Sequence, residues 1–197
     1  MIDIAALRSM PERQGRPPRV LDVACGTGIF LKQLLEQVPN LEAYGIDASA
    51  DMLAQAQALL AELAQVHLEQ VEVGTGETEL LPYAPETFDL ITCTNALHDL
   101  PDPVGMLVRL RRLLASGGQL VLEDFARRAP PFPWKVFEWL VRRVVGRQVH
   151  VYTLKEAESL CREADLHIVC EKTFSIDWLL HGWGLRASRP HFDKMKS

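Results

Sequence analysis

Several features that would place a protein in a particular class are missing from this sequence. No apolar stretch approaches the ~20 residues that a membrane-spanning helix needs, and the first residues lack the basic and apolar regions of a signal peptide. Basic residues are outnumbered, because 21 lysines and arginines face 26 acidic residues and leave a net charge of -5. That balance disfavours extended contact with nucleic-acid phosphates. We therefore expect a cytoplasmic protein with no nucleic-acid partner and little tendency to associate with membranes.

Cysteine is sparse as well. Cys25, Cys93, Cys161 and Cys170 form no Cys-x-x-Cys pair, and no cysteine or histidine pair has the spacing of zinc ligands. Two of the four fall within apolar, strand-like runs. We expect reduced and mostly buried thiols, and no bound metal.

What the sequence does contain is a regular alternation of short apolar runs and helical patterns. At 197 residues and 48% hydrophobic content, the chain is long enough for one domain with a full core. The alternation is typical of βαβ units and a mostly parallel sheet. We expect a Rossmann-like, doubly wound α/β fold of seven strands, with helices on both faces and the last strand antiparallel. The expected strands are 20–24, 41–46, 67–73, 88–94, 119–124, 166–174 and 183–188.

Capping signals locate the helices between these strands. Helical spacing from Leu31 to Val38 predicts the first helix of the alternation, and Ser49 is the expected N-cap of the next one. Pro103 is expected to open a helix that Gly117-Gly118 ends. The run 153–156 is a capping box for a helix to about residue 165, and 134–145 is expected to form an apolar helix.

These elements predict a single domain over residues 1–197. Residues 1–19 are expected to be a short N-terminal segment, with at most a short helix over 2–10 and a linker over 11–18. Residues 125–152 are expected to be an insertion that caps the site and lines an acceptor pocket. With so short a segment before the first strand, three alternatives stay open: an open site, a site covered by a partner subunit in an oligomer, or a native chain that begins upstream.

The most informative segment is Val20 to Gly28, an apolar strand that leads through Gly26-Thr27-Gly28 into a helix. Glycines suit a sharp turn that a ligand must approach closely. Asp47 follows nineteen residues after Gly28, at the end of the second expected strand, where an acidic side chain can accept from both hydroxyls of a ribose. The pattern predicts a nucleoside site, which NAD-linked oxidoreductases share.

Two residues disfavour NAD. Leu31 replaces the third glycine of Gly-x-Gly-x-x-Gly, which lets a helix pack closely beneath a pyrophosphate. Asp22 lies inside the strand before the turn, where its carboxylate can order the loop or face a ligand ammonium group. S-adenosylmethionine carries an ammonium, a carboxylate, a ribose and an adenine but no phosphate, so it fits these residues better.

Residues 20–28 resemble motif I of class I S-adenosylmethionine-dependent methyltransferases, especially those that act on small molecules. Three further segments resemble that family in the same order along the chain: Gly76 to Tyr83, Phe88 to Pro103, and Leu114 to Asp124. The resemblance implies the fold already expected and a methyltransferase with S-adenosylmethionine as cofactor and S-adenosylhomocysteine as product. Glu77 stands where the family usually has aspartate.

Carried over by position, the resemblance implies a set of cofactor-binding residues. Residues of the turn border the methionine part, Asp47 binds the ribose, and Glu77 accepts from the adenine amino group. The full set is Asp22, Ala24, Gly26, Thr27, Gly28, Asp47, Ala48, Met52, Gly76, Glu77, Thr78, Thr94 and Asn95. Other interpretations stay open: Asp22 as a residue that only orders the loop, Met52 as a core residue, and Glu77 as a solvated acid.

The methyl acceptor is less well specified. His98 follows the fourth strand at the carboxyl edge of the sheet, so it is the candidate general base, with packing against the cofactor or capping of a loop as the alternatives. Phe125, Trp134 and Trp183 are the candidate pocket residues, with an ordinary core role as the alternative. We expect a small, apolar or aromatic acceptor molecule. The remaining alternatives are a non-catalytic S-adenosylmethionine-binding or scaffold protein and an NAD-linked oxidoreductase.

Overall fold

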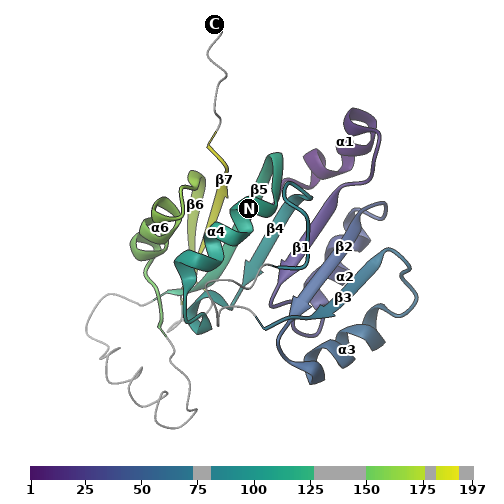
Figure 1. The fold of residues 1–197 in the computed structure, drawn as a ribbon, viewed down its shortest axis with the longest axis horizontal. Coiled ribbons are helices and arrows are strands. Elements are labelled where there is room, and N and C mark those ends of the chain that lie inside the picture. Colours follow the sequence, from purple (N-terminus) through teal and green to yellow (C-terminus); the bar gives the residue numbers. More distant parts are fainter. Residues whose placement is uncertain (73–80, 127–149, 176–180, 191–197) are drawn as a thin grey trace, which may run out of the picture.

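The structure, a computed structural model, describes residues 1–72, 81–126, 150–175 and 181–190. Within them, one seven-stranded sheet runs in the order β3-β2-β1-β4-β5-β7-β6 (Figure 1). Its strands are β1 (Arg19–Val23), β2 (Glu42–Asp47), β3 (Val66–Gln70), β4 (Phe88–Thr94), β5 (Leu114–Ala126), β6 (His167–Ser175) and β7 (His181–Ser188). The strands from β3 to β5 pair in parallel, and β7 pairs antiparallel with both β5 and β6. The predicted fold class, including the antiparallel last strand, is confirmed.

Helices cover both faces of the sheet. They are α1 (Ile4–Gln14), α2 (Ile29–Gln37), α3 (Ala50–Leu60), the short 3-10 helix η1 (Leu97–Asp99), α4 (Pro103–Leu113) and α6 (Leu154–Glu163). One apolar cluster joins the sheet to α4 and α6, and a second joins its other face to α1, α2 and α3. In Figure 1, α4 lies in front of the sheet and α2 behind it. Among the described residues, no helix has both the length and the apolarity to cross a membrane.

The caps read from the sequence form as predicted. The Ser49 hydroxyl accepts from the Met52 N–H at 3.3 Å, which satisfies one of the unpaired donors at the start of α3. At the start of α6, Thr153 and Glu156 bond reciprocally in a capping box. These local bonds place the first turn of each helix independently of the remaining fold.

Several element boundaries differ from the prediction, among them the ends of two helices. The helix that begins at Pro103 ends at Leu113 rather than at Gly117-Gly118, because Leu114 is fully buried, extended and paired with Phe88 of β4. The two glycines instead lie inside β5, where the register against β4 shifts. Helix α1 continues to Gln14, beyond the expected boundary at residue 10.

The cysteines follow the prediction where the structure describes them. Cys25, Cys93 and Cys161 are buried, Cys170 is half-buried, and all four are free thiols. Burial raises the pKa of Cys25 and of Cys161 to about 12. Such thiols are protonated and unreactive at neutral pH.

Candidate functional site

The turn after β1 adopts left-handed backbone conformations, which favour glycine. Ala24, Gly26 and Gly28 all have positive φ, at 56°, 54° and 76°. A Cβ on Gly28 would lie 2.8 Å from Leu60 Cδ1 and 3.1 Å from Ala56 Cβ, so this glycine lets α2 approach α3. A Cβ on Gly26 would meet nothing within 4 Å. Gly28 therefore serves packing, whereas Gly26 borders open space that a ligand can occupy.

Close packing beneath the turn does not depend on a third glycine. Leu31 is fully buried in α2, and it fits against β2 because Gly45 has no side chain. A Cβ on Gly45 would lie 3.0 Å from Leu31 Cδ1 and 2.9 Å from Cys25 Sγ. The space that a dinucleotide fold keeps free by a glycine in the helix is here occupied by a leucine. This arrangement supports the prediction against a pyrophosphate ligand.

Asp47 closes the turn from the end of β2. Its Oδ2 accepts from the Gly26 N–H at 2.8 Å, and its Oδ1 accepts from the Ser49 N–H at 2.8 Å. A carboxylate offers about four lone-pair sites, so two bonds leave acceptor capacity on both oxygens. One side chain thus joins the glycine turn to the start of α3 and still presents acceptors at the strand end where a ribose is predicted.

Asp22 lies deep in the sheet behind the turn. Its side chain is 1% exposed and accepts a hydrogen bond of 2.6 Å from the Thr92 hydroxyl of the neighbouring strand β4. Burial raises the pKa of Asp22 to about 7, and the Thr92 bond opposes that rise. The bond between β1 and β4 orders the strands just before the turn. A ligand ammonium group nearby would favour the ionised carboxylate.

The start of α3 presents an exposed apolar side chain to this edge. Met52 is 43% exposed, so it is not the core residue that the alternative interpretation required. Ala48 is also exposed. Both lie within five residues of Asp47 in sequence, one on each side of the capping Ser49. They can therefore contact the apolar part of a nucleoside held by Asp47.

The carboxyl end of β4 lies next to the turn, because β4 pairs with β1 on one side and with β5 on the other. Asn95 has a positive φ of 53°, and its N–H donates to the Glu123 carbonyl of β5 at 2.7 Å. Strained residues therefore follow both central strands, Ala24 after β1 and Asn95 after β4. Strain of this kind often concentrates at functional sites.

A cavity of about 360 Å³ opens on the α2 face of the sheet, beside the end of β4. Thr92, Thr94 and Glu123 contribute to its polar lining, and Phe30 and Phe174 contribute to its apolar lining. Thr94 is the predicted site residue that it includes. The cavity therefore adjoins the strand end where the methyl group is predicted to lie.

His98, the predicted base, lies in η1 just beyond β4. Its Nδ1 is 2.9 Å and 3.0 Å from the two carboxylate oxygens of Asp124 in β5, and its N–H donates to the same carboxylate at 3.0 Å. Burial lowers the pKa of His98, but the bond to Asp124 and the charges of Asp124 and Asp99 raise it by more, so the net pKa is above its usual value. The ring also packs against Phe125, with centroids 4.6 Å apart.

The three candidate pocket aromatics have different positions. Phe125 is half-buried at the end of β5 and contacts His98, so it remains next to the site. Trp183 is fully buried in the core, and its indole N–H donates to the Tyr152 carbonyl at 3.0 Å. The core interpretation therefore describes Trp183. Trp134, the expected helix 134–145 and the adenine residues Gly76, Glu77 and Thr78 lie outside the described residues.

Sequence reasoning missed Asp124 and Thr92 as parts of the site. Asp124 closes the fifth-strand segment of the family pattern, and that position was the available signal. Its contact with His98 joins positions 26 residues apart, and the Thr92 contact with Asp22 joins positions 70 residues apart. Both contacts depend on the pairing of neighbouring strands.

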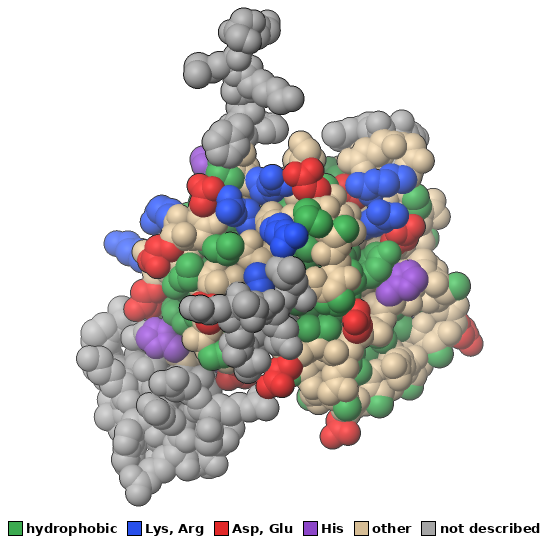
Figure 2. Space-filling view, in the orientation of Figure 1, with side chains coloured by type: hydrophobic (Ala, Val, Ile, Leu, Met, Phe, Trp, Pro, Cys, Tyr) green, Lys and Arg blue, Asp and Glu red, His purple; other side chains and the backbone are tan. Residues whose placement is uncertain are grey.

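Charge divides between the two edges of the sheet. In Figures 1 and 2 the parallel strands run downward from the edge next to α1, and lysine and arginine side chains gather in the upper half of the face in view. Carboxylates lie near the strand ends at the opposite edge: Asp47 at the end of β2, Asp99 beyond β4 and Asp124 in β5. Such an edge favours a ligand with positive charge over a phosphate.

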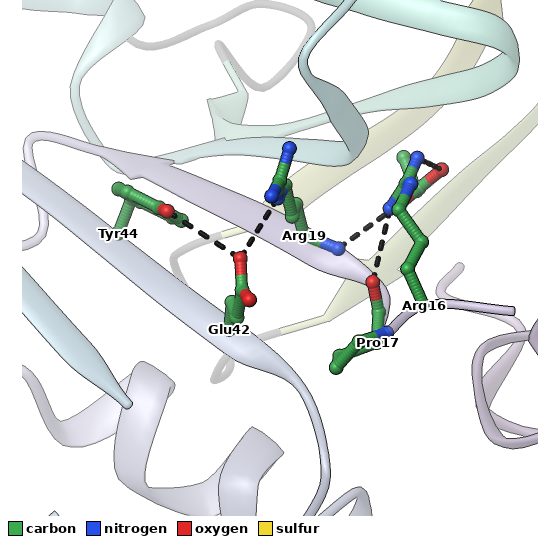
Figure 3. Close-up of polar contacts among 6 residues, drawn as sticks. Arg16, Pro17, Arg19, Glu42 and Tyr44 are labelled. Atoms are coloured by element: carbon green, nitrogen blue, oxygen red, sulfur yellow. Dashed lines mark hydrogen bonds and ion pairs between the residues drawn. The ribbon is translucent and has the colours of Figure 1, made fainter. Parts of the chain in front are cut away.

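Basic residues at the amino edge are held by acidic partners. Arg16 bonds both oxygens of buried Asp89, at 2.7 Å and 2.9 Å, and the Arg19 N–H donates to the same carboxylate at 2.9 Å. The Arg19 guanidinium also donates to Glu42 at 2.8 Å, beside the Tyr44 hydroxyl (Figure 3). These pairs tie the start of β1 to β2 and β4. They serve the fold rather than a ligand at the carboxyl edge.

Comparison with known proteins gives a consistent result. A family described as a methyltransferase domain matches residues 21–120. The demethylmenaquinone methyltransferase of Deinococcus radiodurans is 35% identical over 132 residues, which cover 66% of this chain and 53% of that protein. The chain spans about half the length of the curated relatives it matches.

Solved structures share the fold. An S-adenosylmethionine dependent methyltransferase from Mesorhizobium loti superposes with a TM-score of 0.71 at 19% identity, covering 95% of this chain and 100% of that one. The [4+2]-cyclase SpnF superposes with a TM-score of 0.73 at 18% identity, covering 95% and 81%. At these identities the likeness establishes the architecture, and activity has to be argued from the site.

Proposed function

Because this chain belongs to the class I S-adenosylmethionine-dependent methyltransferase family, we propose that it transfers a methyl group from S-adenosylmethionine to a small, planar, apolar acceptor of the quinol class. The observation that carries the proposal is the contact between Asp47 and the glycine turn. One carboxylate holds Gly26 at the edge of open space and keeps acceptor capacity for a ribose.

The described residues fit the cofactor from one end to the other. Asp47, whose Oδ1 also accepts from the Ser49 N–H, would accept from the ribose hydroxyls, and exposed Met52 would lie against the adenine. The turn at Gly26 allows close approach of the methionine part, and Thr94 and Asn95 border the methyl group at the end of β4. Glu77 and Thr78 would complete the adenine contacts. When bound, the cofactor supplies a methyl group that its sulfonium already activates for displacement.

The protein's contribution to that displacement is alignment and exclusion of water. Holding two reactants in line can be equivalent to effective concentrations of ~10⁵–10⁸ M. The carboxylates at this edge would hold the positively charged cofactor, and they must do so without blocking the acceptor. Asp22 and Asp47 lie behind and beside the glycine turn, which leaves the side facing β4 and β5 for the acceptor.

The acceptor class rests on two kinds of support. Relatives at 31–35% identity are named demethylmenaquinone methyltransferases, and demethylmenaquinone is a planar quinone with an apolar tail. In addition, half-buried Phe125 lies against His98 at the end of β5 and offers an aromatic face there.

Calorimetric titration with S-adenosylhomocysteine tests the cofactor site. We expect micromolar binding by the wild-type chain, and at least a tenfold loss in Asp47→Asn, which corresponds to about 1.4 kcal/mol. Asp51→Asn is the matched control, because Asp51 lies four residues away in the first turn of α3 and is exposed. Binding that is unchanged in Asp47→Asn, or absent in well-folded wild type, would remove the basis of the proposal.

Methyl transfer is tested separately, with radiolabelled S-adenosylmethionine and a short-chain reduced demethylmenaquinone under anaerobic conditions. Labelled methyl in the organic phase is the expected result. Label that stays in the cofactor, while S-adenosylhomocysteine binds normally, would retain the cofactor site and reject the acceptor class.

A further inference from the structure

The geometry points to His98 and Asp124 as a base and its positioning residue, so that the acceptor is one that gives up a hydroxyl proton as it is methylated. This inference rests on the proposed function and narrows its substrate class. It adds a residue that the sequence did not assign, and it requires that the acceptor carry an ionisable O–H group.

Asp124 is held by hydrogen-bond donors on both of its carboxylate oxygens. It is 2% exposed, and its carboxylate accepts from three N–H groups: the backbone N–H groups of His98 and Phe125, at 3.0 Å and 2.8 Å, and the His98 ring. The two backbone bonds fix the orientation of the Asp124 carboxylate independently of the His98 ring.

Contact with the Asp124 carboxylate decides which ring nitrogen of His98 carries the proton. Nδ1 lies 2.9 Å from Asp124 Oδ1, and a carboxylate can only accept, so Nδ1 must be the donor. In the neutral ring Nε2 is then the nitrogen with a free lone pair. Asp124 therefore holds His98 in the tautomer that can take a proton through Nε2.

Position in the fold places His98 near the proposed reaction. His98 follows β4 and Asp124 lies near the end of β5, and these neighbouring strands pair as far as Thr94 with Glu123. The glycine turn follows β1 on the other side of β4. Strands are spaced about 4.8 Å apart, so the dyad lies roughly one to two strand widths from the turn. This is the side of the turn left for the acceptor.

Titratable groups around the ring are few among the described residues. Asp99 of η1 lies 3.8 Å from Nε2 through its Oδ2, and Asp124 faces Nδ1 from β5. His150 donates its backbone N–H to the His98 carbonyl at 2.9 Å. Phe125 covers one face of the ring. Both carboxylates stabilise the imidazolium that forms when His98 takes a proton.

The proposed step balances as follows. The acceptor O–H bond breaks, its proton moves to His98 Nε2, and the electron pair stays on the acceptor. That pair, at oxygen or delocalised to the neighbouring ring carbon, forms the bond to the methyl carbon as the carbon–sulfur bond breaks and its electrons remain on sulfur. After transfer to carbon, the ring carbon loses its hydrogen as a proton and the oxygen regains one. The imidazolium then returns its proton to solvent.

Nitrogen NMR of the labelled protein tests the dyad without any acceptor. We expect neutral His98 to carry its proton on Nδ1, and Asp124→Asn to lower the His98 pKa by at least one unit. Asp99→Asn is the matched control, since Asp99 is nearly half exposed and has no bond to Nδ1. It should lower the pKa by less and leave the tautomer unchanged. A proton on Nε2, or a titration that Asp124→Asn does not move, would overturn the positioning role.

Single-turnover methyl transfer to the short-chain quinol tests the base. His98→Asn keeps an amide N–H for Asp124 but removes Nε2, so we expect a loss of ~10²–10⁴ in rate with affinity for S-adenosylhomocysteine within threefold of wild type. Wild-type rate should rise with pH through the His98 titration. A His98→Asn rate close to wild type would overturn the base assignment. A wild-type enzyme that binds cofactor but does not methylate the quinol would instead reject the acceptor class, and the NMR result stands apart from that outcome.

Discussion

Two glycines of one turn provide a sharp test, because the structure gives them different tasks. Gly26 and Gly28 both have positive φ, so alanine at either position carries the cost of a left-handed backbone, roughly 1–2 kcal/mol. At Gly26 the new methyl group meets no atom within 4 Å. Gly26→Ala should therefore lower the free energy of unfolding by only that cost, or roughly 2–4 °C in Tm for each kcal/mol in a chain of this size.

At Gly28 the same methyl group enters a packed interface. It would lie 2.8 Å from Leu60 Cδ1 and 3.1 Å from Ala56 Cβ. Leu60 Cδ1 can move, but Ala56 Cβ is fixed to the α3 backbone. Overpacking of this kind typically costs ~1–3 kcal/mol, so Gly28→Ala should cost ~2–5 kcal/mol in total. The cost of Gly28→Ala beyond that of Gly26→Ala should shrink when Ala56→Gly removes the fixed contact. The coupling free energy between Gly28→Ala and Ala56→Gly should be at least ~0.5 kcal/mol.

Ligand binding should show the opposite order. A methyl group on Gly26 projects into the space proposed for the methionine part of the cofactor, so Gly26→Ala should weaken S-adenosylhomocysteine at least about 30-fold, or about 2 kcal/mol. Urea unfolding and calorimetric titration of both variants measure the two effects. The reasoning fails if Gly28→Ala is no more destabilising than Gly26→Ala, or if Gly26→Ala binds the cofactor as wild type does.

Three further predictions separate fold from site. Burial raises the Asp22 pKa to about 7. Between about pH 4 and pH 7 the folded chain therefore holds a proton that the unfolded chain has lost, so the free energy of unfolding falls as pH rises. Asp22→Asn should flatten that fall in urea unfolding curves. Trp183→Phe removes the donor to the buried Tyr152 carbonyl and should cost ~1–3 kcal/mol, with S-adenosylhomocysteine affinity unchanged in calorimetry. Arg16→Ala removes both guanidinium hydrogen bonds to buried Asp89. Thermal melts should therefore show a lower Tm, while cofactor affinity again stays constant.

Elements whose signals lie within a few neighbouring residues were predicted correctly from the sequence. Strand β4 spans Phe88–Thr94 as predicted, because an apolar run flanked by turn residues has few other ways to bury itself. Ser49 caps α3 and Thr153 caps α6, since each cap bond joins residues three apart. The glycine turn and Asp47 were found in the same way, by residue type and spacing.

Errors arose where distant parts of the chain compete for the same residue. Gly117-Gly118 is an ordinary helix stop, yet pairing with Phe88 draws Leu114 into β5 before the glycines are reached. Trp183 is an aromatic near the end of the chain, which alone is equally typical of a pocket and of a core. Its hydrogen bond to the carbonyl of Tyr152, in the segment just before α6, decides for the core.

The chain's composition, its alternation of apolar runs and its glycine turn with Asp47 were enough to indicate the fold class and the family, and they predict the edge of the sheet at which a ligand binds. These properties are encoded in short windows, because periodicity, caps and turns depend on near neighbours. The parallel pairing of β1, β4 and β5 decided the rest. It joins Asp22 to Thr92 and His98 to Asp124 across 70 and 26 residues, and contacts at such separations exist only after the strands are placed side by side.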